Sequence, residues 1–114
     1  MSMMEIPLFP LHVDLQPGQK LPLRIFEPRY LNMIKRVAGK TAAFGIVPII
    51  EGSDAGAIPL IEERGTLVTI TDFQKMPDGL LGITVLGEGP FKIHRTWTLE
   101  DGLLMGEIST VANA

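Results

Sequence analysis

From Thr41 onward, the chain is a succession of apolar and β-branched runs separated by turn-forming residues. β-Branched and aromatic side chains suit a pleated sheet, so each run predicts a strand. After Pro90, apolar and polar residues alternate apart from Arg95, which is typical of a strand with one face in water. This pattern restricts the chain to a mostly β fold. The predicted strands cover residues 43–50, 66–73, 80–86, 91–99 and 103–110.

Turn signals between these strands are strong. Pro77-Asp78-Gly79 predicts a turn, and Asp101-Gly102 predicts a tight hairpin. Gly87-Glu88-Gly89-Pro90 predicts a bend or bulge, because glycine and proline weaken a strand ladder. Near the amino terminus, the two prolines within residues 6–11 predict an edge strand or a strand with a break. A second short strand is predicted over residues 21–26.

A single helix is predicted directly after the second strand. Pro28 suits the first helical position, where a missing N–H costs nothing. Gly39 is placed to end the helix, and the basic residues near that end have the sign that the helix dipole favours. The apolar residues that recur at helical spacing are Tyr30, Leu31, Met33, Ile34, Val37 and Ala38. We therefore predict a mostly β (α+β) fold of about six antiparallel strands and one prominent helix, closed or nearly closed into a barrel that hides the strand edges.

Composition narrows the functional classes. With 114 residues, the chain has the length of one domain. It contains no cysteine, which excludes disulfides and thiolate metal sites and suits a reducing cytoplasm. Thirteen acids outnumber ten basic residues, and the net charge of -3 disfavours nucleic acid, whose binders carry a basic excess. No apolar stretch approaches the roughly 20 residues of a membrane span, so we expect a soluble cytoplasmic protein.

Two glycine-containing segments match nucleotide-binding loops only in part. Gly39-Lys40-Thr41 has the end of a phosphate loop, yet Ile34 stands where that pattern needs its first glycine. The tripeptide also follows a predicted helix, whereas a phosphate loop precedes one. In the glycine-rich segment 82–89, the spacing of a dinucleotide fingerprint fails because Lys92 stands in place of the third glycine. We therefore expect no bound nucleotide or other cofactor.

Catalytic and metal-binding motifs are absent from the sequence. His12 and His94 have no second histidine or acidic cluster at ligand spacing, and His94 lies on the polar face of its predicted strand. None of the serines lies in a Gly-x-Ser-x-Gly elbow or has a lysine or histidine at motif spacing. The aspartates fall in or beside predicted turns, where they are commonly structural. We expect no enzyme, no metal site and a solvated His94.

The segment Arg24-Ile25-Phe26-Glu27-Pro28-Arg29-Tyr30 places two arginines, a glutamate and two aromatic residues at the junction of strand and helix. In an architectural interpretation, Glu27 pairs with an arginine while Phe26 and Tyr30 enter the core. In a functional interpretation, Arg24 or Arg29 grips a ligand carboxylate at a binding rim. The residues by themselves favour the architectural interpretation.

Two segments near the amino terminus resemble the opening of the Lon protease amino-terminal (substrate-binding) domain family. They are Ile6-Pro7-Leu8-Phe9-Pro10-Leu11 and Leu21-Pro22-Leu23-Arg24-Ile25-Phe26-Glu27-Pro28-Arg29-Tyr30. Weaker blocks follow in the expected order, and the resemblance spans nearly the entire chain. The short length and Gly89-Pro90 are more similar to stand-alone bacterial Lon-domain proteins. The weaker blocks are Gly65-Thr66-Leu67, Asp78-Gly79-Leu80, Leu81-Gly82-Ile83-Thr84-Val85 and Gly87-Glu88.

The resemblance implies one domain over residues 1–114, a PUA-like pseudo-β-barrel with one prominent helix after the second strand. In full-length Lon proteases such a domain helps to select damaged or tagged proteins for an ATPase module and a Ser-Lys protease module, and this chain has the motifs of neither. A non-catalytic domain that binds unfolded or flexible polypeptide is thus implied, with a protease as an expected partner. Relatives continue into helices after the barrel, so the ending at Ala114 indicates a trimmed domain or an unusually short member.

The predicted binding surface is an apolar groove on the barrel. An RNA-binding module is the alternative function, since PUA-like barrels often serve RNA-modifying systems, although the acidic balance and the single Trp97 oppose it. A small-molecule enzyme is the third option and requires a cleft with two carboxylates of perturbed pKa. The groove rim is assigned to Phe9, Pro10, Leu11, Arg24, Glu27, Arg29 and Tyr30.

Overall fold

The computed structural model describes residues 3–38, 44–52 and 59–111. Every predicted strand is present, although 80–86 and 91–99 form one long strand. A two-residue strand, β4, was not predicted, because so short an element carries no periodic pattern. The predicted helix end at Gly39, with the rest of Gly39-Lys40-Thr41, lies outside the described residues. The elements are β1 (Met3–Leu11), β2 (Lys20–Ile25), α1 (Pro28–Val37), β3 (Phe44–Glu51), β4 (Leu60–Ile61), β5 (Arg64–Lys75), β6 (Leu81–Thr98) and β7 (Leu104–Thr110).

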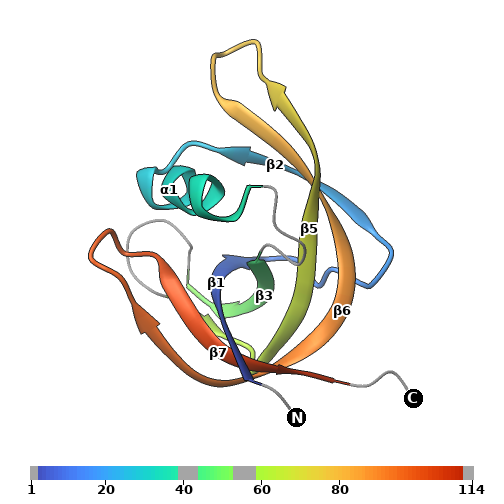
Figure 1. Cartoon of the computed structure of the whole chain (residues 1–114), viewed down its shortest axis with the longest axis vertical. Coiled ribbons are helices and arrows are strands. Elements are labelled where there is room, and N and C mark those ends of the chain that lie inside the picture. The colour runs from blue at the N-terminus through green and yellow to red at the C-terminus, as the bar shows by residue number, and fades with distance from the viewer. Residues whose placement is uncertain (1–2, 39–43, 53–58, 112–114) are drawn as a thin grey trace.

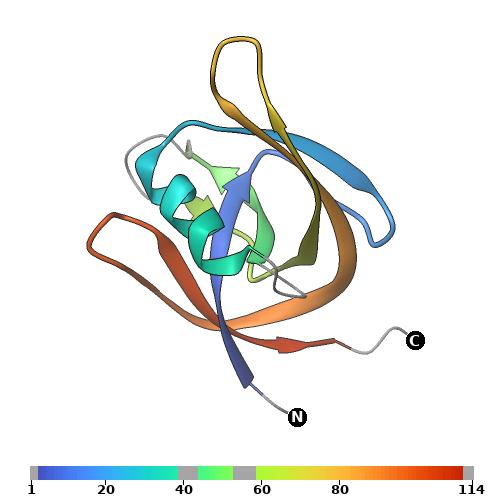
Figure 2. The same ribbon diagram turned by 45° about the horizontal axis from the view of Figure 1, so that its top comes forward.

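The strands form a closed ring (Figure 1). They pair in the order β1-β7-β6-β5-β3, and β3 pairs back to β1. The short β4 extends the sheet from β3, while β2 pairs with β6 beside the ring. Figures 1 and 2 both show the β5–β6 hairpin projecting from one end of the ring, with α1 next to β2. Ring closure pairs backbone groups that an open sheet leaves at its edges, which confirms the predicted fold class.

β1 changes partner along its length. Residues 3–7 pair antiparallel with β7, and residues 8–11 pair parallel with β3. The expectation of antiparallel strands alone was therefore wrong for one pair, whose connection through β2 and α1 has the length that a parallel pair requires. Each half of β1 pairs with a described strand on one side, and one proline falls in each half. The two prolines, which predicted an edge strand, are thus compatible with a strand inside the ring.

β6 is the longest strand and pairs with three others. Its first half lies between β2 and β5, and its second half pairs with β7. Glu88 is an extra residue opposite β5, so the predicted bend is a bulge inside a continuous strand. His94 is a second extra residue, opposite β7. Arg95 follows this bulge directly and is exposed, where it lies over the Trp97 ring.

The bulge at Glu88 receives the loop that precedes β2. The N–H of Gly87 donates a hydrogen bond to the Gln19 carbonyl at 2.8 Å, and the N–H of Gly18 donates one to the Gly87 carbonyl at 2.8 Å. A Cβ atom on Gly87 would lie 2.5 Å from the Gln16 carbonyl oxygen, closer than atoms in contact can approach. Glycine is therefore required here for the loop to reach β6.

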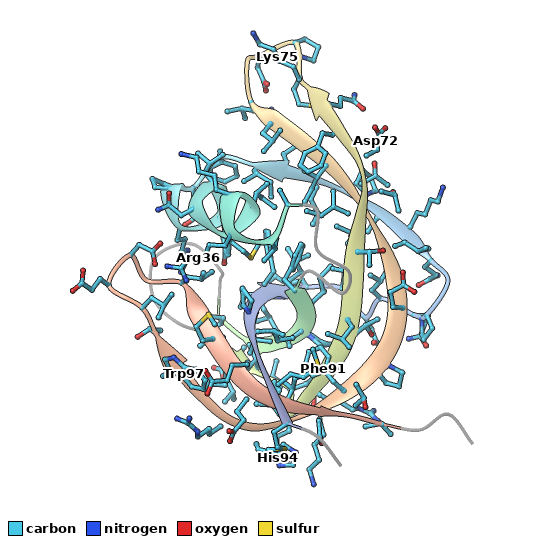
Figure 3. The ribbon with its side chains drawn as sticks, viewed as in Figure 1. Arg36, Asp72, Lys75, Phe91, His94 and Trp97 are labelled. Carbon is cyan, nitrogen blue, oxygen red and sulfur yellow. The ribbon has the colours of Figure 1, made fainter. Side chains whose placement is uncertain are left out.

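The apolar face of α1 packs into one of two buried clusters. Its buried residues are Tyr30, Met33, Ile34 and Val37, four of the six predicted for this face, whereas Leu31 is half-buried and Ala38 is exposed. This cluster also contains inward-facing residues of β2, β3, β5 and β6, so the helix fills the space enclosed by the strands at one end of the ring. The second cluster surrounds Phe91 at the other end, and Figure 3 shows this side chain inside the ring.

The predicted Asp101-Gly102 turn is confirmed at the β6–β7 hairpin. Gly102 has a φ of +89°, a conformation that favours glycine. The Leu103 N–H donates to the Asp101 side chain at 3.0 Å, so both residues of the motif contribute to the turn. The hairpin lies next to the start of α1, where the Gly102 carbonyl accepts a hydrogen bond from Arg29.

We predict that Gly87→Ala destabilises the domain by about 1–3 kcal/mol, because the added methyl group displaces the loop backbone. Gly89→Ala is the matched control from the same bulge, since a Cβ atom there has no neighbour within 4 Å. The control should change the free energy of unfolding by less than about 1 kcal/mol. Urea unfolding followed by circular dichroism measures both variants. Equal destabilisation by the two substitutions would contradict the role given to Gly87.

Candidate functional site: a groove between β1 and β2

A groove of about 420 Å³ lies where β1 and β2 approach without pairing. It exists because β2 pairs with β6 and the first half of β1 pairs with β7, while α1 occupies the space between. Apolar side chains make up most of its wall, as is usual for binding sites in proteins. The lining residues are Phe9, Leu11, Pro22, Leu23, Arg24, Phe26, Glu27 and Tyr30.

The floor of this groove is a pair of stacked aromatic rings. Phe9 and Tyr30 have centroids 4.0 Å apart and planes 3° from parallel, and Phe44 lies behind Phe9 at 6.2 Å. Phe9 is 4% exposed and Tyr30 is 3% exposed, so their rings belong to the core as well as to the groove. The floor is consequently rigid, and replacing either ring would disturb the fold.

Arg29 joins the start of α1 to the β6–β7 hairpin. Its guanidinium lies 3.1 Å from a Glu27 carboxylate oxygen, donates to the Gly102 carbonyl at 3.3 Å and lies 4.8 Å from the centre of the Tyr30 ring. The Arg29 side chain is only 11% exposed. These contacts confirm the predicted pairing of Glu27 with an arginine. Arg29 is therefore a structural residue, because its planar guanidinium group binds other groups of the domain.

Arg24 has a different environment. It lies on the outward side of β2 and forms an ion pair with Asp78 at the tip of the β5–β6 hairpin. Both side chains are well exposed, at 56% for Arg24 and 42% for Asp78. An exposed pair of this kind contributes about 0–1 kcal/mol, because water competes for both charges. Arg24 is thus a charge at the groove rim that is held only weakly.

Phe26 departs from the architectural interpretation, which placed it in the core. The structure leaves it 62% exposed, more than any other large apolar side chain among the described residues. The reason is strand alternation: Ile25 points inward and is buried, so the next side chain points outward. Phe26 therefore adds an exposed aromatic ring to the apolar lining of the groove.

Of the seven predicted rim residues, Phe9, Leu11, Arg24, Glu27 and Tyr30 line the groove. Pro10 and Arg29 do not line it. Pro10 is buried in the pairing of β1 with β3, and Arg29 faces the hairpin. The sequence interpretation missed the lining residues Pro22, Leu23 and Phe26. Alternation along 21–26, read from the buried Ile25, was the signal that could have placed Phe26 outside.

Outside the groove, the described residues include few candidates for a catalytic or metal-binding site. His94 is exposed, as predicted, but its Nε2 atom lies 2.7 Å from the Ser109 hydroxyl on the neighbouring strand, a pairing that the sequence spacing did not reveal. His94 lies at the periphery of the ring (Figure 3), and this bond satisfies a buried hydroxyl. Within the described ranges, no group of three or more potential metal ligands occurs. Over the same ranges, no helix is both long and apolar enough to cross a membrane.

We predict that Arg29→Lys destabilises the domain by about 1–3 kcal/mol, because an ammonium group cannot reach Glu27 and the Gly102 carbonyl together. Arg36→Lys is the matched control, since Arg36 lies on the exposed side of the same helix. It should leave the free energy of unfolding within about 0.5 kcal/mol of the parent value. Urea denaturation tests both. A neutral Arg29→Lys variant would remove Arg29 from the structural role assigned above.

Comparison with known proteins shows which family this chain resembles. A sequence model of the ATP-dependent protease La (LON) substrate-binding domain matches residues 5–114. Lon protease of Parabacteroides distasonis is 29% identical over 108 residues, which are 93% of this chain and 13% of that protein. Protein cereblon of Danio rerio is 27% identical over 112 residues, or 94% of this chain and 25% of that protein. The chain thus spans a minor part of these curated relatives.

Solved structures agree with the sequence match. The Lon N-terminal domain protein from Xanthomonas campestris superimposes with a TM-score of 0.81 at 35% identity, covering 96% of this chain and 60% of that one. The N-terminal domain of a Mycobacterium avium complex Lon protease gives a TM-score of 0.74 at 17% identity, covering 97% and 56%, and this likeness concerns the fold alone. The match extends over nearly all of the described ring and its helix. The chain belongs to the ATP-dependent protease La (LON) substrate-binding domain family.

Proposed function

We propose that this domain binds unfolded or flexible polypeptide in the groove between β1 and β2. The observation that carries the proposal is Phe26, an aromatic ring 62% exposed at the edge of a groove with an apolar floor. The family supports a non-catalytic, substrate-recognising role, and the matched residues contain no ATPase or protease domain. A protease that acts on the bound substrate is part of the proposal as a partner, and we place both in the cytoplasm.

The groove suits an extended chain with apolar side chains. Leu11 and Leu23 form opposite walls from β1 and β2, and the Phe9–Tyr30 stack forms the floor. Covering the exposed part of Phe26 would contribute about 1–2 kcal/mol to binding through loss of apolar surface. Such contacts depend on apolar area more than on a particular sequence, which is the property that recognition of many unfolded substrates needs.

Residues of the groove have separate roles in this proposal. Phe26, Pro22, Leu23 and Leu11 contact the bound chain, and the stacked rings support it from below. Arg24 and Glu27 stand at the rim. Pro10 and Arg29 act only by holding β1 and α1 in place. RNA is a poor fit to the same surface, because Arg24 is the one basic residue among the described residues that line it.

We predict that Phe26→Ala weakens the binding of an unfolded polypeptide by about five- to thirtyfold without unfolding the domain. The probe is a fluorescently labelled globular protein that has been reduced and carboxamidomethylated, and fluorescence anisotropy measures its dissociation constant. Phe73→Ala is the matched control, since Phe73 is 49% exposed on the β5–β6 hairpin and does not line the groove. This control should bind like the parent protein.

A second variant tests a competing surface. Ile50, Leu60 and Val111 are exposed around another hollow of about 700 Å³ near β4. Leu60→Ala should leave the anisotropy titration unchanged. If Leu60→Ala weakened binding and Phe26→Ala did not, the polypeptide would bind near β4 and the groove assignment would be wrong. Binding of single-stranded RNA in place of polypeptide would overturn the proposed function itself.

A further inference from the structure

We propose that the groove prefers an extended segment in which an acidic side chain lies two residues from a large apolar one, and that the acidic carboxylate replaces Asp78 on Arg24. This preference rests on the proposed function and specifies its substrate class. The apolar residue would pack against Phe26 over the stacked rings. We base this preference on the two charged residues at the rim, Glu27 and Arg24, because their ion pairs within the domain differ in strength.

The negative charge at the rim is neutralised within the protein. Glu27 is 23% exposed and lies 3.1 Å from Arg29, which is itself held by the Gly102 carbonyl and the Tyr30 ring. A bound chain cannot easily displace an arginine with this many contacts. Glu27 therefore contributes little attraction for a basic segment.

The positive charge at the rim is exchangeable. Arg24 lines the groove, whereas its partner Asp78 does not and belongs to the projecting β5–β6 hairpin. The two residues are 54 positions apart in sequence, and each is exposed to water. Since such a pair contributes about 0–1 kcal/mol, a carboxylate brought by a bound chain can take the place of Asp78 at small cost. The groove consequently offers a cation to an acidic ligand group.

The spacing of the two recognition residues defines the spacing in the ligand. Arg24 and Phe26 are two positions apart at the end of β2, and both line the groove. In an extended chain, side chains two positions apart face the same way and are about 6.5–7 Å apart. An extended ligand that lies along β2 would match this distance with an acidic and an apolar residue separated by one residue.

The net charge of the chain, -3, acts against an acidic ligand at long range. At physiological ionic strength, this repulsion is largely screened beyond about 8 Å, so it opposes the approach of an acidic ligand only weakly. The preference itself comes from the local pair and not from the field of the whole domain.

Four synthetic peptides test the preference by fluorescence anisotropy. All have acetylated amino termini and extended, proline-flanked apolar sequences. The first carries Glu-x-Phe and an amidated carboxyl terminus, and the second replaces this Glu by Gln. The third has the composition of the first with the Glu moved away from the Phe, and the fourth is the Gln peptide with a free carboxyl terminus. The Glu-x-Phe peptide should bind about two- to fivefold more tightly than the other three.

Protein variants identify the charge that is responsible. Arg24→Gln should abolish the difference between the Glu and Gln peptides, and Asp78→Asn should raise affinity for the Glu peptide by about two- to fivefold, because the internal competitor is gone. Arg95→Gln is the matched control: Arg95 is 58% exposed, also forms surface ion pairs and lies away from the groove. It should leave the discrimination intact. Urea unfolding of each variant verifies that the fold is retained.

The outcomes separate this proposal from the proposed function. Equal binding of the Glu and Gln peptides, both weakened by Phe26→Ala, would overturn the acidic preference and leave the groove assignment standing. Tighter binding of the peptide with the free carboxyl terminus alone would also overturn it, in favour of terminal carboxylate recognition. Failure of every peptide to bind, together with an unfolded polypeptide that ignores Phe26→Ala, would contradict the proposed function.

Discussion

The ladder of β6 is the constraint on which the rest of the structure depends. One strand must pair with β5 throughout most of its length, with β2 in its first half and with β7 in its second half. The extra residues Glu88 and His94 form bulges in this strand, and bulges bend the strand that carries them. The loop before β2 reaches the first bulge only because Gly87 has no side chain. The closed ring and the position of β2 both follow from this arrangement.

The groove is a consequence of the same pairing. Because β2 occupies the edge of β6 beyond the end of β7, it cannot also pair with β1, and a gap remains between the two strands. α1 fills this gap with Tyr30, Met33, Ile34 and Val37, but its first turn leaves a channel above the Phe9–Tyr30 stack. The groove therefore has a rigid floor and an exposed edge. The proposed binding of apolar segments would therefore require no rearrangement of the domain.

Much of the fold could be predicted, because local signals agree with the global structure. β-Branched runs, the Asp101-Gly102 turn and the position of Pro28 each determined their element from neighbouring residues alone. The parallel pairing of β1 with β3 could not be predicted, since it depends on ring closure between distant segments. The architectural interpretation of Phe26 failed because apolar character was read as burial, whereas alternation from Ile25 turns the ring outward. The partner of Arg24 lies 54 residues away, so only the fold reveals it.

A backbone amide NMR titration tests most directly whether polypeptide binds between β1 and β2. A uniformly nitrogen-labelled domain is titrated with an unfolded, carboxamidomethylated polypeptide and, separately, with single-stranded RNA. We expect shifts with the polypeptide that are confined to the ends of β1 and β2 and the first turn of α1, and none with RNA. Polypeptide shifts centred elsewhere, such as around β4, or shifts with RNA alone that fade as salt rises, would contradict it.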